Sequence, residues 1–144
     1  ADWFAAERAW YVRTAEREGV PDDEALAGAD ATYRRLLPDG PHTAGLRLRA
    51  LFDSGTRIGS LWLSVGGDGL PAGLNAYVYA VEVAPEHRGR GHGRALMREA
   101  DRLCDEAGAR RLGLSVYAGN EPALSLYRSL GYRTREVYLS KSLA

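Results

Sequence analysis

One stretch organises this sequence, namely Val81-Glu82-Val83-Ala84-Pro85-Glu86-His87-Arg88-Gly89-Arg90-Gly91-His92-Gly93-Arg94. An apolar, β-rich run that begins at Ala76 leads into it and ends at Pro85. Beyond it, Gly108 stands where a helix C-terminal cap is expected. Between the two, apolar residues recur at helical spacing, at Leu96, Ala100, Leu103 and Ala107. The stretch is therefore predicted to be a loop between a strand and a helix with one apolar face.

A strand, a glycine-rich loop and a helix together form an arrangement that binds phosphate. The first backbone amides of a helix lack partners within the helix, and the helix dipole adds roughly half a positive charge at this end. Glycine lets the backbone approach an anion closely. The loop also supplies guanidinium groups, at Arg88, Arg90 and Arg94. We therefore expect an anionic ligand that carries phosphate.

Two common phosphate-binding motifs do not fit this loop. A P-loop ends in Lys-Ser or Lys-Thr, and the sole lysine of the chain is Lys141. A dinucleotide fingerprint, G-x-G-x-x-G, would need glycine at the position of Arg94. The pattern that fits is R-x-x-G-x-G, which runs here from Arg88 to Gly93.

A second segment follows, Leu114-Ser115-Val116-Tyr117-Ala118-Gly119-Asn120-Glu121-Pro122-Ala123-Leu124-Ser125-Leu126-Tyr127-Arg128-Ser129-Leu130-Gly131-Tyr132. Apolar residues alternate with other residues at Leu112, Leu114 and Val116, which predicts a strand. Asn120 is a good N-cap, and Gly131 ends the short helix that we expect after it.

With these two segments the chain resembles the GNAT superfamily of acyl-CoA-dependent N-acyltransferases. In that family R-x-x-G-x-G follows a strand that ends in V-x-V-x-P, and it wraps the pyrophosphate of coenzyme A. The family's second segment reads N-x-x-A-x-x-x-Y and then L-G-F or L-G-Y, and Asn120, Ala123 and Tyr127 fall at those spacings. The resemblance covers about residues 57–143.

The resemblance implies an α/β fold of the GNAT type, with a mixed, strongly twisted central sheet flanked by helices. We expect one domain over residues 1–144, with a helical, acceptor-side part at 1–45 and an acyl-CoA-binding core at 57–143. Family members usually begin with a short strand, whereas this sequence begins with a helical pattern, so we expect the first N-terminal strand to be absent.

The pattern along the chain predicts the order of the elements. Two helices come first, ended by Gly19 and by Pro38-Asp39-Gly40. An antiparallel meander of three strands follows, then a helix, a strand, a second helix and a last strand. The meander strands are expected at Leu46–Phe52, Ile58–Val65 and Ala76–Val83, and the last strand at Tyr132 to about Ser142.

The resemblance also assigns the cofactor contacts. The backbone of Val81 to Val83 is expected to pair with the pantetheine arm, and the amide of Val83 to polarise the thioester carbonyl. The pyrophosphate is expected to lie against Arg88, Gly89, Arg90, Gly91, His92, Gly93 and Arg94, with His92 contributing its backbone only. His42 and His87 are expected to be exposed loop residues.

Tyr127 matches the family's general acid, and Asn120 matches the residue that binds the cofactor arm or a water near the sulfur. The alternative is a purely structural role, in which Tyr127 is a core tyrosine and Asn120 is only a helix cap. The general base is less defined, because Ser115 stands where some members have glutamate. Glu82 is our candidate for the base or the amine anchor, although strand alternation points it opposite to Val81 and Val83. The alternative is a chain of water molecules through Tyr77, Tyr79 or Tyr117.

We therefore expect an N-acetyltransferase that moves an acetyl group from acetyl-CoA to a primary amine of a small molecule or peptide. A non-catalytic acyl-CoA-binding module, a protein N-terminal acetyltransferase and a longer-chain acyltransferase on the same fold are the alternatives. A group of acidic and aromatic residues could bind a cationic amine. Alternatively, the acids only stabilise a helix N-terminus and the aromatic residues only pack in the core. These residues are Asp22, Asp23, Glu24, Trp3, Trp10 and Trp62.

Composition limits the remaining possibilities. The 144 residues are 45% hydrophobic and 26% charged with a formal net charge of zero, so we expect no nucleic-acid or membrane partner. Cys104 is the only cysteine, which excludes an internal disulfide, favours a cytoplasmic location and suggests a packing role. We expect no metal, and open strand edges leave room for a homodimer.

Overall fold

The computed structural model describes Ala9, Asp39 and residues 43–66 and 70–143. Contacts divide the chain into two units, Ala1–Leu114 and Ser115–Ala144, and each is described by itself. The two helices expected at the start of the chain lie outside the described residues. The same holds for His42, Trp3, Trp10 and the acids at 22–24.

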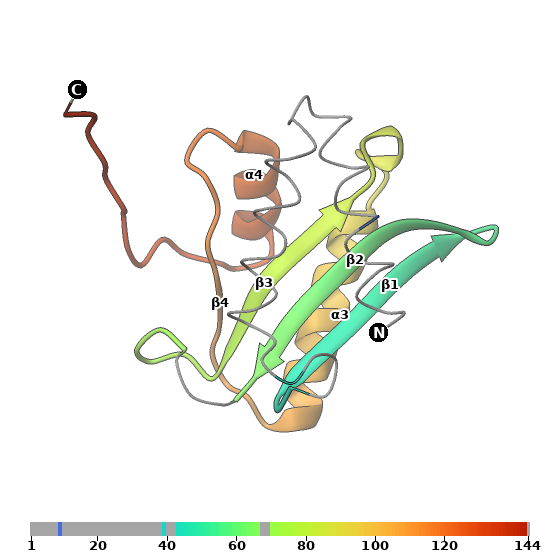
Figure 1. The fold of residues 1–144 in the computed structure, drawn as a ribbon, viewed down its shortest axis with the longest axis horizontal. Coiled ribbons are helices and arrows are strands. Elements are labelled where there is room, and N and C mark those ends of the chain that lie inside the picture. The colour runs from blue at the N-terminus through green and yellow to red at the C-terminus, as the bar shows by residue number, and fades with distance from the viewer. Residues whose placement is uncertain (1–8, 10–38, 40–42, 67–69, 144) are drawn as a thin grey trace. The chain divides into compact units, whose positions relative to one another are not determined.

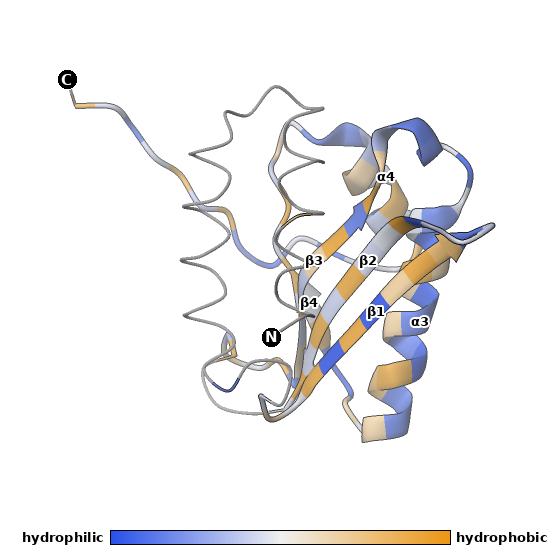
Figure 2. Cartoon of the chain, turned by 45° about the vertical axis from the view of Figure 1, so that its right-hand side comes forward, coloured by the Kyte–Doolittle hydropathy of each residue, from blue (hydrophilic) through white to orange (hydrophobic). Residues whose placement is uncertain are grey.

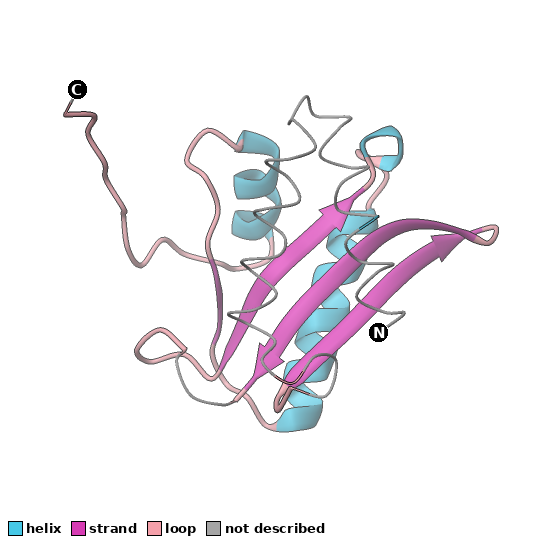
Figure 3. Ribbon diagram, in the orientation of Figure 1, coloured by secondary structure: helices cyan, strands magenta, loops and turns pink. Residues whose placement is uncertain are grey.

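The described residues of the first unit form a sheet of four strands (Figures 1 and 3): β1 (Leu46–Asp53), β2 (Thr56–Val65), β3 (Ala76–Val83) and β4 (Leu112–Leu114). They lie in the order β1-β2-β3-β4. The first three are antiparallel, and β4 is parallel to β3. The predicted meander and the mixed sheet are confirmed. The β1–β2 hairpin turns through Ser54 and Gly55, whose φ angles of 50° and 81° are the positive values that tight hairpin turns require.

Helix α3 (His92–Ala107) covers one face of this sheet and packs against β2 and β3 (Figure 1). Gly59 of β2 faces α3, because a Cβ on it would lie 3.3 Å from Leu96 Cδ1. Strand alternation then assigns the buried Leu61 and Leu63 to the same face. The core of this unit therefore lies between α3 and the central strands.

The buried stripe of α3 differs from the predicted one at its end. Leu96, Ala100 and Leu103 are buried as expected, but Ala107 is exposed, so that prediction is wrong. Met97 and Cys104 are buried instead, each one residue beyond a predicted core position. The stripe is therefore wider and one turn shorter than the sequence indicated. Figure 2 shows that α3 carries both apolar and polar residues. The packing role of Cys104 is confirmed.

Strand β3 contains a bulge that changes which side chains share a face. Trp62 of β2 pairs with Ala80, but the next residue, Leu63, pairs with Val78. Tyr79 is the extra residue. A bulge of this kind shifts the phase of strand alternation by one residue. Side chains before and after Tyr79 therefore do not follow the simple alternation that the sequence predicts.

The second unit contains helix α4 (Glu121–Ser129). The Asn120 side chain accepts a hydrogen bond from the Ala123 amide at 3.2 Å, and Gly131 has φ of 95° beyond the helix end, so both predicted ends are confirmed. The predicted strand before it is shorter, since β4 ends at Leu114 and leaves out Val116.

The last strand, predicted from Tyr132 to about Ser142, is wrong, because this segment has no regular secondary structure (Figure 3). Its apolar residues are largely exposed, with 92% of Tyr138 accessible. A strand exists only where a neighbour completes its hydrogen bonds, and alternation alone does not supply one. No helix among the described residues is long and apolar enough to cross a bilayer.

Candidate active site

The glycine loop meets the first turn of α3 in a backbone conformation that favours glycine. Gly89 and Gly91 have φ of 76° and 84°, in the left-handed region. Gly91 is the N-cap of α3, and no side chain caps this end of the helix. A Cβ at either glycine would meet no atom of the described residues within 4 Å. Both glycines therefore leave space for an anion to approach, and the first amides of α3 are suited to hold it.

His92, Gly93 and Arg94 belong to the first turn of α3 itself, so they follow the loop directly as helix residues. Their backbone amides are at the positions that have no partner four residues earlier in the helix. The structure thus brings the predicted pyrophosphate residues, from Arg88 to Arg94, together around one helix end.

The edge of β3 beside this loop carries backbone groups that point away from β2. The Ala84 amide donates to the Ile58 carbonyl at 2.8 Å, and Val83 is paired with Gly59. Since hydrogen-bonding direction alternates along an antiparallel pair, the N–H and C=O groups of Val81 and Val83 face the other side. Pairing between β3 and β4 ends at Val78. This edge is therefore suited to an extended ligand that binds like an added strand.

Arg88 makes a contact that the sequence did not predict. Its Nε donates to the Val83 carbonyl at 2.9 Å, which ties the glycine loop to the end of β3. This contact is made to the strand backbone, whereas the sequence predicted a guanidinium directed at phosphate. No sequence signal distinguishes these roles, because a loop arginine suits both.

Glu82 lies on the face of β3 opposite to α3. Its partner across the ladder is Ser60, and directly paired residues share a face. Gly59, one residue earlier on β2, faces α3. The expectation that Glu82 points opposite to Val81 and Val83 agrees with this register.

The two histidines of the loop lie near each other. The ring centroids of His87 and His92 are 6.5 Å apart in an edge-on arrangement. The expectation that His87 is an exposed loop residue is wrong. Its side chain is half-buried, and its Nδ1 is buried without a hydrogen-bond partner among the described residues. It lies in the short 3-10 turn η2 (Pro85–His87), which brings it against the start of α3.

Asn120 and Tyr127 lie in the second unit and are described within it. Tyr127 is half-buried on α4, with its ring centroid 5.7 Å from that of Tyr132. Burial raises the pKa of the Tyr127 phenol above its ordinary value. The hydroxyl is therefore protonated at neutral pH, as a proton donor must be.

A pocket of about 310 Å³ occurs elsewhere in the first unit, at the far end of β3 from Val83. Its lining includes Val65, Asn75 and Gly108, and no residue of the glycine loop. The glycine loop and the first turn of α3 are a better candidate for the cofactor site than this pocket, because backbone amides and cationic side chains lie together there. Over residues 43–66 and 70–143, no three His, Cys, Asp or Glu side chains are grouped as a metal site.

Comparison with known proteins settles the family. The family model described as Acetyltransferase (GNAT) family matches residues 4–132. The chain belongs to the GNAT acetyltransferase family. It is therefore an acetyltransferase, and the cosubstrate of this family is acetyl-CoA.

Relatives of this GNAT acetyltransferase agree with that assignment. An uncharacterized N-acetyltransferase of Bacillus subtilis (strain 168), YdgE, is 30% identical, with 97% of this chain and 92% of the relative covered. Streptothricin acetyltransferase of Streptomyces lavendulae is 42% identical over 72% of this chain and 59% of its own length. The crystal structure of YycN from Bacillus subtilis has a TM-score of 0.72 at 23% identity, covering 99% of this chain and 91% of that one, and supports the fold.

Proposed function

We propose that this GNAT acetyltransferase moves the acetyl group of acetyl-CoA directly to a primary amine of a small molecule. The nitrogen–carbon bond of the new amide forms as the carbon–sulfur bond of the thioester breaks. The amine loses one proton and the departing sulfur gains one. The relative that acts on streptothricin supports a small-molecule amine as the acceptor.

The proposal depends mainly on one observation, that the outward-facing edge of β3 leads into the uncapped N-terminus of α3. In this proposal the pantetheine arm pairs with Val81 and Val83. The amides of the first turn of α3, with Gly89 and Gly91 beside them, hold the pyrophosphate. The Val83 N–H donates to the thioester carbonyl and stabilises the negative charge that develops on its oxygen.

Two side chains handle the protons. Tyr127 gives its phenolic proton to the departing sulfur. The thiolate forms in a poorly solvated site, which makes it a stronger base than in water, where a thiol has a pKa near ~8.5. Asn120 caps α4, which fixes the helix that carries Tyr127, and binds the cofactor arm or a water near the sulfur. Glu82 accepts the proton of the amine or anchors its ammonium form before deprotonation.

Calorimetry with acetyl-CoA, followed by an acetylation assay on a panel of amines, tests this function. We expect acetyl-CoA to bind and coenzyme A to be released only when an amine is present. A Tyr127→Phe variant should bind acetyl-CoA like the wild type but turn over about 10²- to 10⁴-fold more slowly. Undiminished turnover would remove Tyr127 as the acid, and absence of acetyl-CoA binding would refute the proposal.

A further inference from the structure

The face of β2 and β3 opposite to α3 carries a row of aromatic rings next to one carboxylate. The rings of Tyr77 and Tyr79 lie 5.1 Å apart, and those of Tyr79 and Trp62 lie 6.1 Å apart, all tilted against one another. Tyr77 and Tyr79 are half-buried, whereas Trp62 is only 8% exposed. Trp62 therefore supports the row from within, and the two tyrosines form its accessible part.

The bulge at Tyr79 places Glu82 in line with this row. In a regular strand, Glu82 would face away from Tyr77 and Tyr79, because it lies five and three positions after them, and both are odd steps. The extra residue shifts the phase, so that Glu82, paired with Ser60, lies on the same face as Trp62. The row thus runs along β3 from Tyr77 through Tyr79 to the carboxylate of Glu82, near the Val83 end.

The same face is the one from which an acceptor can reach the proposed thioester. A carbonyl bound by the Val83 N–H in the plane of the sheet exposes its two faces above and below that plane, and a nucleophile attacks perpendicular to the carbonyl. On the α3 side, the buried Leu96 lies against Gly59, the partner of Val83. The amine therefore approaches from the side of Glu82 and the tyrosines.

The charge of this face indicates what kind of acceptor it suits. From Ser60 to Ser64 and from Ala76 to Val83 there is one acid, Glu82, and no lysine or arginine. Aromatic faces attract cations through their negative π surface, and a carboxylate does so by its charge. Both features favour a positively charged ligand over a neutral or anionic one.

We infer that the acceptor is a cationic amine with two charged ends. Its reacting amine lies at Glu82, and a second cationic group of the same molecule lies over the ring of Tyr79. The inference rests on the proposed function and adds the class of substrate to it. Tyr77 and Tyr79 are then residues that determine specificity, whereas the sequence suggested them only as carriers of a water chain.

A matched pair of amines tests this inference. The compound (3-aminopropyl)trimethylammonium and its uncharged isostere 4,4-dimethylpentylamine differ in one atom, a quaternary nitrogen in place of carbon. With acetyl-CoA saturating, the wild type should acetylate the charged amine about 3- to 30-fold more efficiently in kcat/KM. Tyr79→Phe, which keeps the ring, should retain this preference, and Tyr79→Leu should lose it. The comparison between variants cancels the different basicity of the two amines.

Binding without transfer gives an independent measurement. Tetramethylammonium, which cannot be acetylated, should compete with the amine in the wild type and in Tyr79→Phe but only weakly in Tyr79→Leu. If Tyr79→Leu no longer binds acetyl-CoA, Tyr79→Ile takes its place as the ring deletion.

The outcomes separate the two proposals. Equal use of both amines by a wild type that binds acetyl-CoA overturns this inference and leaves the proposed function intact. The same result follows from a preference that survives loss of the ring. Absence of acetyl-CoA binding and of any acetylation overturns both.

Discussion

At the scale of single residues, Arg88 shows how one hydrogen bond can join two parts of a site. Its Nε holds the Val83 carbonyl at 2.9 Å, and Val83 carries the amide that we propose for the thioester. A bond of this kind fixes the last peptide groups of β3, because its pairing with β4 ends at Val78. In our proposal Arg88 therefore positions the Val83 peptide group. Arg90, a second arginine of the same loop, serves as the comparison.

We predict that Arg88→Ala lowers kcat about tenfold while acetyl-CoA affinity changes little, because a small misplacement of the polarising amide slows the chemical step. Arg90→Ala should instead weaken acetyl-CoA binding, and more so at low salt, since an exposed cation near a phosphate acts through screened charge. Kinetics and calorimetry on both variants measure this difference. A loss confined to acetyl-CoA affinity in Arg88→Ala would make Arg88 a phosphate ligand instead.

Tyr127 gives a second prediction at this scale. Burial raises its pKa, so folding favours the neutral phenol. The stability that this group contributes is fully present below pH ~10 and is lost as the pH rises through the raised folded value. The difference in tyrosinate absorbance between wild type and Tyr127→Phe should titrate with a midpoint above pH ~10. A midpoint at or below the ordinary tyrosine value would contradict the burial.

At the scale of elements, helix α3 has one glycine at each end, and the two have similar backbone conformations. Only Gly91 lies beside the proposed pyrophosphate site. Gly91 at its start has φ of 84°, and Gly108 at its end has φ of 74°. A Cβ would meet no atom within 4 Å at either position. The two therefore form a natural pair for separating backbone strain from ligand binding.

We predict that Gly91→Ala and Gly108→Ala each destabilise the fold by about 1–2 kcal/mol, the cost of the left-handed conformation for a residue with a Cβ. Only Gly91→Ala should also weaken acetyl-CoA binding, by tenfold or more, because its methyl group enters the space beside the first amides of α3. Thermal unfolding and calorimetry check the two effects. Equal acetyl-CoA affinity in both variants would place the pyrophosphate elsewhere.

At Gly59, β2 packs closely against both β3 and α3. A Cβ at Gly59 would lie 2.9 Å from the Glu82 carbonyl oxygen and 3.3 Å from Leu96 Cδ1. We predict that Gly59→Ala costs about 1–3 kcal/mol in the free energy of unfolding, because a strand backbone must move. Gly119→Ala, where the methyl group meets nothing within 4 Å, is the control and should be nearly neutral. Similar losses in both would show that the site at Gly59 adapts.

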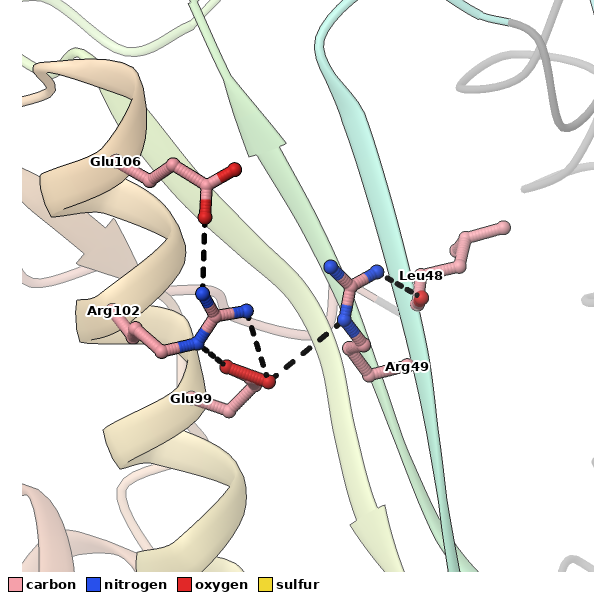
Figure 4. Close-up of polar contacts among 5 residues, drawn as sticks. All are labelled: Leu48, Arg49, Glu99, Arg102 and Glu106. Carbon is pink, nitrogen blue, oxygen red and sulfur yellow. Dashed lines mark hydrogen bonds and ion pairs between the residues drawn. The ribbon is translucent and has the colours of Figure 1, made fainter.

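At the scale of the whole molecule, surface charges link β1 to α3, as Figure 4 shows. The Glu99 carboxylate accepts a hydrogen bond from Arg102 Nε and lies 3.8 Å from Arg49 Nε. Arg102 also pairs with Glu106, whose Oε2 lies 3.0 Å from Arg102 Nη1. The hydrogen bond from Arg102, and then the charges of Arg102 and Arg49, lower the pKa of Glu99.

We predict that Glu99→Gln reduces stability at neutral pH by less than about 1 kcal/mol, since the group is largely solvated. A lowered carboxyl pKa contributes stability that is present above its unfolded value of 4.5 and is lost as the pH falls through the folded value. The difference between wild type and variant in denaturant unfolding should therefore vanish in acid and shrink in high salt. A difference that persists below pH ~3 would point to packing instead of charge.

The sequence by itself determined the elements whose signals are local. The Gly108 cap at the end of α3 and the Asn120 cap at the start of α4 depend on backbone preferences of a few neighbouring residues, and both occur where the sequence predicts them. The family motifs are local in the same sense, which is why R-x-x-G-x-G and the segment around Tyr127 sufficed to predict an acetyltransferase.

Only the tertiary structure decided the features that depend on partners far apart in the chain. The bulge at Tyr79 arises from the pairing of β3 with β2, and it brings Glu82 onto the face of the tyrosines. The bond from Arg88 to Val83 and the burial of Met97 likewise depend on where a second element lies. The segment after Tyr132 alternates like a strand but has no ladder. Alternation states which side chains could share a face, whereas hydrogen bonds across strands decide whether and in what register they do.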